Sequence, residues 1–214
     1  LSGVTFGLAL LTELGGNGRT WTALEGSVGG VSLVGLPDGL TLSASNLALE
    51  VNQAAADGSV VDFSAAPFTL PTGPGTSLTL DLAASEGELL RVAAEVTLNL
   101  FDFVFLSGGV AFGSASSEVT LSDGSTVAVD ALTLGASNLT VFAGVNRGTD
   151  DEIGVGLAGV DFGLLLAHEQ GGSGREWLAF GGSAAGLTFD AVPGIALGAS
   201  SLGIEINRAA ADGT

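Results

Sequence analysis

The feature that most constrains this chain is an internal repeat. Residues 1–59 return, with roughly half of the residues unchanged, as residues 157–214. The match is close in a Gly-rich stretch, where residues 15–21 correspond to 171–177. The period is about 155 residues, so the chain holds one full repeat, residues 1–156, and the start of the next. We expect a window from a longer array whose units bury their apolar faces on neighbours.

A shorter motif, Leu-x-Ala-Ser-Asn/Ser-Leu, occurs three times inside this pattern. Its copies begin at Leu42, Leu134 and Leu197. They divide the period into two related half-modules, residues 1–59 and 78–148, joined by a Pro-rich connection at 60–77. In each copy the apolar positions change parity across the motif. Because side chains in a strand alternate with period two, we expect a bulge or corner at each Ala-Ser-Asn/Ser site.

The residue pattern predicts an all-β, mainly antiparallel protein. Apolar residues alternate with Ser, Thr and Gly, and 35 Gly residues would destabilise helices. We expect hairpins around the Gly-rich turn at 15–18, at 78–100, and at 119–134, where Asp-Gly suits a type I′ turn. The aromatic run 101–105 is expected to span a corner with both faces covered. The predicted architecture is a set of stacked hairpin modules, extended and solenoid- or fibre-like.

Composition excludes several classes of function. The chain is 46% hydrophobic with a mean hydropathy of +0.55, so it can bury a sizeable core. Its net charge of −18 argues against nucleic acid or an anionic membrane as a partner. No Cys is present, so disulfides cannot stabilise it. We expect no membrane-spanning segment, and surface acid that keeps an apolar array soluble.

Two patterns with catalytic associations lack the context that their chemistry needs. Residues 154–159 have the Gly spacing of a dinucleotide-binding fingerprint, but residues 160–167 alternate like a strand instead of opening a helix. His168 is the single histidine, and Thr12 occupies its place in the first repeat. No set of nucleophile, base and oxyanion donors can be named, so we predict no enzyme activity and no resident cofactor.

Acidic turns are the sites most suggestive of ligand chemistry. Calcium takes six to eight oxygen ligands, which loop carboxylates and carbonyls can supply. The candidate calcium ligands are Asp150, Asp151 and Glu152 in one loop, and Asp57 and Asp212 in matching Ala-Asp-Gly turns. Turn geometry alone also explains the Asp-Gly pairs. Asn138 begins a glycosylation sequon inside the bend motif.

One acid and one Arg recur on either side of the Gly-rich turn. Glu13 and Arg19 in the first repeat correspond to Glu169 and Arg175 in the second. We expect each pair to form an ion pair across its hairpin.

The long period, the Gly/Ser/Thr/Val composition, the absence of Cys and the acidic balance resemble the repeat arrays of giant bacterial cell-surface or secreted proteins, including adhesins. This resemblance implies an extracellular or cell-surface stalk, fibre or filament without enzyme activity. Its partners would be neighbouring repeats of the same chain or identical chains. Two alternatives stay open: a hydrophobic β-groove that binds or conducts lipid, and a calcium-stiffened adhesin module.

Overall fold

The computed structural model describes residues 1–192 and 195–213, and apart from one short 3-10 turn all of their regular secondary structure is β-strand, which confirms the all-β prediction. The main sheet contains β1 (Ser2–Thr12), β2 (Thr20–Ser32), β3 (Leu40–Gln53), β6 (Leu89–Leu100), β7 (Val104–Thr120), β8 (Thr126–Val145), β9 (Ile153–Glu169), β10 (Glu176–Val192) and β11 (Ile195–Arg208). Strands β4 (Phe68–Gly73) and β5 (Thr76–Leu80) form a separate hairpin, followed by a 3-10 turn at Ala84–Glu86.

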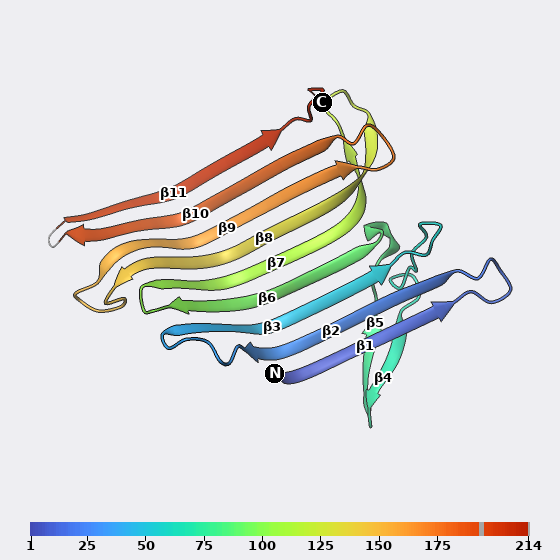
Figure 1. Cartoon of the computed structure of the whole chain (residues 1–214), viewed down its shortest axis with the longest axis horizontal. Helices are drawn as coiled ribbons and strands as arrows, with labels where there is room; N and C mark the ends of the chain where they lie inside the picture. Colours follow the sequence, from blue (N-terminus) through green and yellow to red (C-terminus); the bar gives the residue numbers. More distant parts are fainter. Residues whose placement is uncertain (193–194, 214) are drawn as a thin grey trace.

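Over the described ranges, the main sheet is one nine-stranded antiparallel meander (Figure 1). Its order is β1-β2-β3-β6-β7-β8-β9-β10-β11, so only the step from β3 to β6 skips elements in the chain. Strands β1 and β11 form the two edges. The sheet therefore grows sideways in the order of the sequence.

The two repeats lie in this same sheet, six strands apart. Strands β9, β10 and β11 are the second copies of β1, β2 and β3, and β6, β7 and β8 stand between them. The repeats are thus joined edge to edge, through backbone hydrogen bonds. This differs from the expected stacking of apolar faces, since in the described chain no repeat packs its face on the other.

The predicted bend is present at all three copies of the short motif. The left-handed residues are Asn46 (φ 52°), Asn138 (φ 49°) and Ser201 (φ 58°). Pairing with the next strand slips by one residue between Ser45 and Ala48 of β3, and the register of β8 also shifts at its motif. The extra residue keeps the apolar side chains before and after the bend on one face.

The sheet has two chemically different faces, and β6 shows both. We call one the apolar face, defined by Leu90, Val92, Ala94, Val96, Leu98 and Leu100 of β6 and by the residues in register with them. One cross-strand row of this face runs through Phe6, Gly26, Leu49, Val92, Phe112, Leu134, Leu164, Phe180 and Ile206. The other, small-residue face carries mostly Gly, Ala, Ser and Thr. It also carries the strand carboxylates Glu25, Glu50, Glu95, Asp161 and Glu205.

The largest packed cluster lies at one end of the small-residue face, beneath the connection between β3 and β6. Its buried members are Ala9, Ala23, Phe63, Leu80, Leu82 and Leu89. A hydrogen bond from Asn52 Nδ2 of β3 to the Val61 carbonyl (2.9 Å) holds the connection to the sheet, and one from Phe63 N to the Leu82 carbonyl (2.9 Å) joins two parts of the connection itself. The β4-β5 hairpin leans on β1, where the Leu70 and Leu78 side chains lie against Gly7.

Three local predictions are wrong. Leu78 and Leu80 do not pair with β6: β5 pairs with β4, because β6 already has β3 and β7 as neighbours. The run at 101–105 is not a corner with both faces covered: residues 101–103 form a tight turn with Phe101 and Asp102 both left-handed, β7 begins at Val104, and the Phe101 side chain is exposed. The 119–134 hairpin exists, but Asp123 is not left-handed; only Gly124 is (φ 84°), so the turn is not type I′.

Candidate functional site

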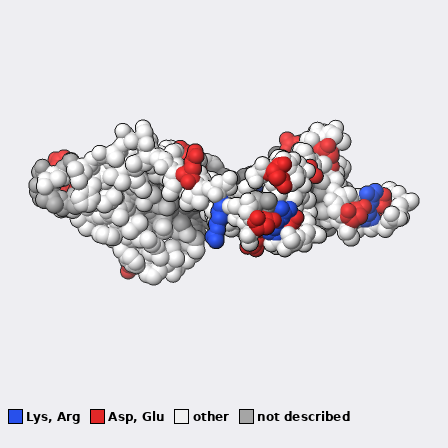
Figure 2. Space-filling view, turned by 90° about the horizontal axis from the view of Figure 1, so that it is seen from above, with Lys and Arg blue, Asp and Glu red and all other residues white. Residues whose placement is uncertain are grey.

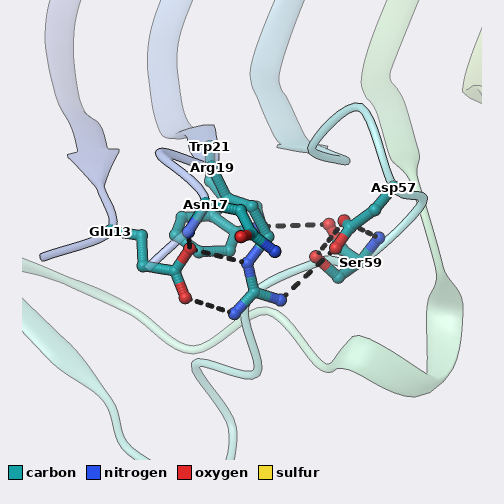
Figure 3. A network of polar contacts seen from close by, with 6 residues as sticks. All are labelled: Glu13, Asn17, Arg19, Trp21, Asp57 and Ser59. Carbon is teal, nitrogen blue, oxygen red and sulfur yellow. Dashed lines mark hydrogen bonds and ion pairs between the residues drawn. The ribbon is translucent and has the colours of Figure 1, made fainter. Parts of the chain in front are cut away.

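The best-organised polar site lies at the turn between β1 and β2 (Figure 3). The Arg19 guanidinium donates from Nε and Nη2 to the Glu13 carboxylate, at 3.1 and 2.6 Å. Its Nη1 lies 3.4 Å from Oδ2 of Asp57, which belongs to the segment that follows β3. One Arg therefore joins a hairpin turn to a strand end 38 residues further along the chain.

The second repeat builds the same cluster. Arg175 Nε and Nη2 donate to the Glu169 carboxylate at 3.0 and 2.8 Å, and Arg175 Nη1 lies 3.5 Å from Asp212 Oδ2. These contacts confirm the expected ion pairs. The hydrogen bond from Arg175 lowers the pKa of Glu169 to about 2, and the same contact from Arg19 lowers the pKa of Glu13. Two copies that differ in half of their residues thus share one turn geometry.

An aromatic ring completes each cluster. Arg19 lies over the Trp21 ring, 5.2 Å from its centroid, and Arg175 lies at the same distance over Trp177. Trp21 Nε1 donates to the Ser59 carbonyl at 3.0 Å, which ties the connection to β2. In each cluster a single Arg contacts two carboxylates from different segments, so the cluster acts as a structural clamp.

The candidate calcium ligands occupy separate places. Asp57 accepts hydrogen bonds from Ser59 and forms an ion pair with Arg19. The hydrogen bonds and the ion pair both lower the pKa of Asp57. Asp212 pairs with Arg175. In the loop 146–152, Glu152 accepts from the Gly148 amide at 2.6 Å. Among residues 1–192 and 195–213, no group of three or more His, Cys, Asp or Glu side chains is placed to hold a metal ion.

The other singled-out residues lie on strands. Residues 154–159 belong to β9, so no helix N-terminus follows the Gly pattern. His168 is exposed near the end of β9, opposite Asp130 and Glu176. Asn138 lies at the bend of β8, where its backbone N–H donates to Asp161 Oδ1 at 2.9 Å. The strand predicted for residues 160–167 and the bend predicted at Asn138 are both present.

What sequence reasoning missed is the pair of open sheet edges. In the described part of the chain no strand pairs with the outer side of β1 or of β11. Strand β1 has neither a charged residue nor a Pro, which are two of the features with which proteins block an edge. The internal repeat could have revealed the open edge of β1. Strand β9 is the second copy of β1, and β9 pairs with a strand on each side.

A second open surface is the apolar face. Several of its large side chains are about two-fifths exposed or more, namely Leu8, Leu90, Phe112, Leu134 and Ile206. The connection and the β4-β5 hairpin pack on the other face. Seen from above the sheet of Figure 1, the charged groups lie in separate patches, and in some of them Arg lies beside Asp or Glu (Figure 2).

Comparison with known proteins gives no match: no family model, no curated protein and no solved structure is significantly similar to the chain. Within the described ranges, none of the helical structure is long and apolar enough to cross a membrane.

Proposed function

We propose that this chain is a structural, non-catalytic repeat segment of a very large extracellular or cell-surface protein, acting in a stalk, fibre or filament. The observation that carries the proposal is the recurrence of β1, β2 and β3 as β9, β10 and β11 in one continuous sheet. The clamp and the bends recur with the strands. A unit that repeats its backbone geometry edge to edge can lengthen a sheet without a new core.

Composition supports the extracellular location. A chain without Cys and with a net charge of −18 needs no reducing compartment and repels itself in solution. An adhesive role agrees with the resemblance to giant adhesins and has no assigned ligand.

The test is electron microscopy of the native material, with intact mass measured on the same sample. We expect filaments or long rods that contain polypeptides far heavier than 20.9 kDa or regular assemblies of this chain. Compact, monodisperse particles of the mass of one chain would refute the proposal.

The uncovered apolar face favours a second candidate, binding of lipid acyl chains. Its rows of Leu, Val, Ile and Phe form an open hydrophobic surface of the kind that marks interaction sites. A fluorescent fatty acid is the probe. We expect Leu134→Glu, on the apolar face, to weaken binding at least tenfold, and Thr133→Glu, on the small-residue face, to leave it unchanged. Equal effects of the two variants, or no binding by the parent chain, would exclude this candidate.

A further inference from the structure

We infer that the outer edge of β1 is a binding site for an antiparallel strand with the sequence pattern of β8, supplied by a further repeat of the same kind. This inference rests on the proposed function, because it names the partner that a growing sheet would add. The pairing would follow the register of β8 on β9.

The first support is the equivalence of β1 and β9. The side of β9 that corresponds to the open side of β1 pairs with β8. Gly3 of β1 has φ 60° and Gly159, its equivalent in β9, has φ 57°. Residues with a side chain adopt this conformation rarely, so Gly is favoured at both positions. The free edge thus already holds the backbone shape that β9 has in its paired state.

The second support is the set of side chains exposed on β1. In β9, the residues Phe162, Leu164 and Leu166 stand opposite Ala136, Leu134 and Leu132 of β8. Their equivalents in β1 are Phe6, Leu8 and Leu10, and these are 64%, 46% and 72% exposed. The predicted partners of this edge are therefore Ala136 for Phe6, Leu134 for Leu8 and Leu132 for Leu10. Every predicted pair joins apolar side chains, which stabilises cross-strand neighbours.

One residue differs between the two edges. Asp161 of β9 accepts the hydrogen bond from the Asn138 amide, and Thr5 occupies the corresponding place in β1. The Thr5 hydroxyl is also an acceptor, so the bend of a β8-type strand keeps a partner there.

The same comparison between the two repeats can be made for the opposite edge, β11. Strand β11 copies β3, and the side of β3 that corresponds to the open side of β11 pairs with β6. Transferring that register places Leu197, Ile204 and Ile206 opposite the equivalents of Leu98, Val92 and Leu90. The three side chains of β11 are 60%, 54% and 46% exposed. Both edges therefore match the neighbours that a six-strand repeat would supply, and six strands span about 29 Å across the sheet.

The test uses a peptide of residues 126–145, with Lys tails for solubility, and the full chain. The chain has no Cys, so single cysteines report one contact each. With oxidised glutathione as the oxidant, we expect the chain variant Phe6→Cys to form a disulfide with a peptide carrying Ala136→Cys, at least tenfold faster than with a peptide carrying Gly135→Cys. In the control peptide the thiol points to the other face. The pair Leu10→Cys and Leu132→Cys tests the register independently, and circular dichroism checks that both chain variants keep their strands.

Equal rates for the two peptides, or no disulfide with either pair, would overturn the inference. So would chains that cross-link to each other through Cys at position 6 and exclude the peptide, because β1 would then bind a second β1. The proposed function fails separately. Peptide pairing without filaments in the native material would refute the filament, whereas filaments without peptide pairing and without a repeat of about 29 Å would refute the edge site.

Discussion

Glu169 and Arg175 illustrate how single residues fix the ends of the strands. The two residues are six positions apart, and the turn between β9 and β10 brings the guanidinium and the carboxylate into a two-point contact. A paired Arg and carboxylate in this geometry limits the rotation of both side chains. Because Arg175 also reaches Asp212, one side chain holds a turn and the end of β11 together.

The low pKa of Glu169 makes the clamp depend on pH. A carboxyl with a pKa of about 2 when folded and about 4.5 when unfolded stabilises the fold above pH 4.5, and this contribution is lost as the pH falls toward 2. We expect Glu169→Gln to lower the melting temperature by a few degrees at pH 7 and to leave it nearly unchanged near pH 2. Thermal melts at both pH values measure this. Glu176→Gln is the control, and a loss of the same size at pH 2 would contradict the ion-pair explanation.

The bends test the role of backbone conformation at the scale of a residue. Asn138 is left-handed with φ 49°, a conformation that Gly adopts freely and a β-branched residue strongly disfavours. We expect Asn138→Val to cost about 1–2 kcal/mol of unfolding free energy and Asn138→Gly to cost much less. Urea titration measures both. Similar losses for Val and Gly would show that the Asn side chain, and not its φ, matters.

At the scale of elements, the strands and bends were predictable and some of the pairings were not. Alternation and the parity change at Ser45 and Asn46 identify a strand with a bulge, because both depend only on neighbouring residues. The hairpin predicted for 78–100 satisfied the same alternation and is wrong. Alternation says that Leu80 lies on an apolar side but not which strand it joins. The pairing of Leu80 was decided by the Pro-rich segment, because this segment forms β4 and β4 pairs with β5.

The aromatic contacts in the middle of the sheet were also not predictable from sequence. Phe142 of β8 is 5% exposed on the small-residue face, and its ring lies against Gly144 and Gly154. Phe105 lies 6.3 Å from the ring of Phe142, and Arg147 lies 4.8 Å from that of Phe105. The glycines leave the space that the ring fills, and this relation appears only once the strands are in register.

Removing that ring should leave a cavity. We expect Phe142→Ala to lower the free energy of unfolding by about 3–5 kcal/mol, the usual cost for a buried Phe. Phe101→Ala is the matched control, because Phe101 is 63% exposed, and its effect should stay within about 0.5 kcal/mol. Chemical denaturation followed by circular dichroism compares them. Equal and small effects would mean that Phe142 is not packed as described.

At the scale of the whole molecule, the fold is a broad amphipathic sheet with its packed core at one end. Stability elsewhere depends on backbone pairing, on the clamps and on side chains in cross-strand contact. Because both edges and the apolar face are open, the stability of much of the sheet depends on what covers these surfaces. The repeat predicted that neighbours exist, but only the strand order showed that they join by edges.

Calcium should have little effect on this assembly of strands. Asp57 and Asp212 are paired with Arg, and the described carboxylates do not converge on a common point. We expect the melting temperature to change by less than about one degree between excess calcium and excess chelator, since a ligand stabilises only by binding the folded state. A rise of several degrees in calcium would restore the calcium-stiffened alternative and direct attention to the loop 146–152.

The meander order has a consequence for how the chain reaches its fold. Almost every strand pairs with the strand that precedes it, so most of the sheet can form by closing short hairpins in succession. Such local contacts favour rapid folding. Within the main sheet, strand β6 is the exception, because it must pair with β3 across the 35-residue segment 54–88. Closing this longer loop costs more conformational entropy than closing a hairpin, and it must happen before the later strands can join the first three. Folding of each repeat is therefore expected to pause at the same place, with β1, β2 and β3 already formed.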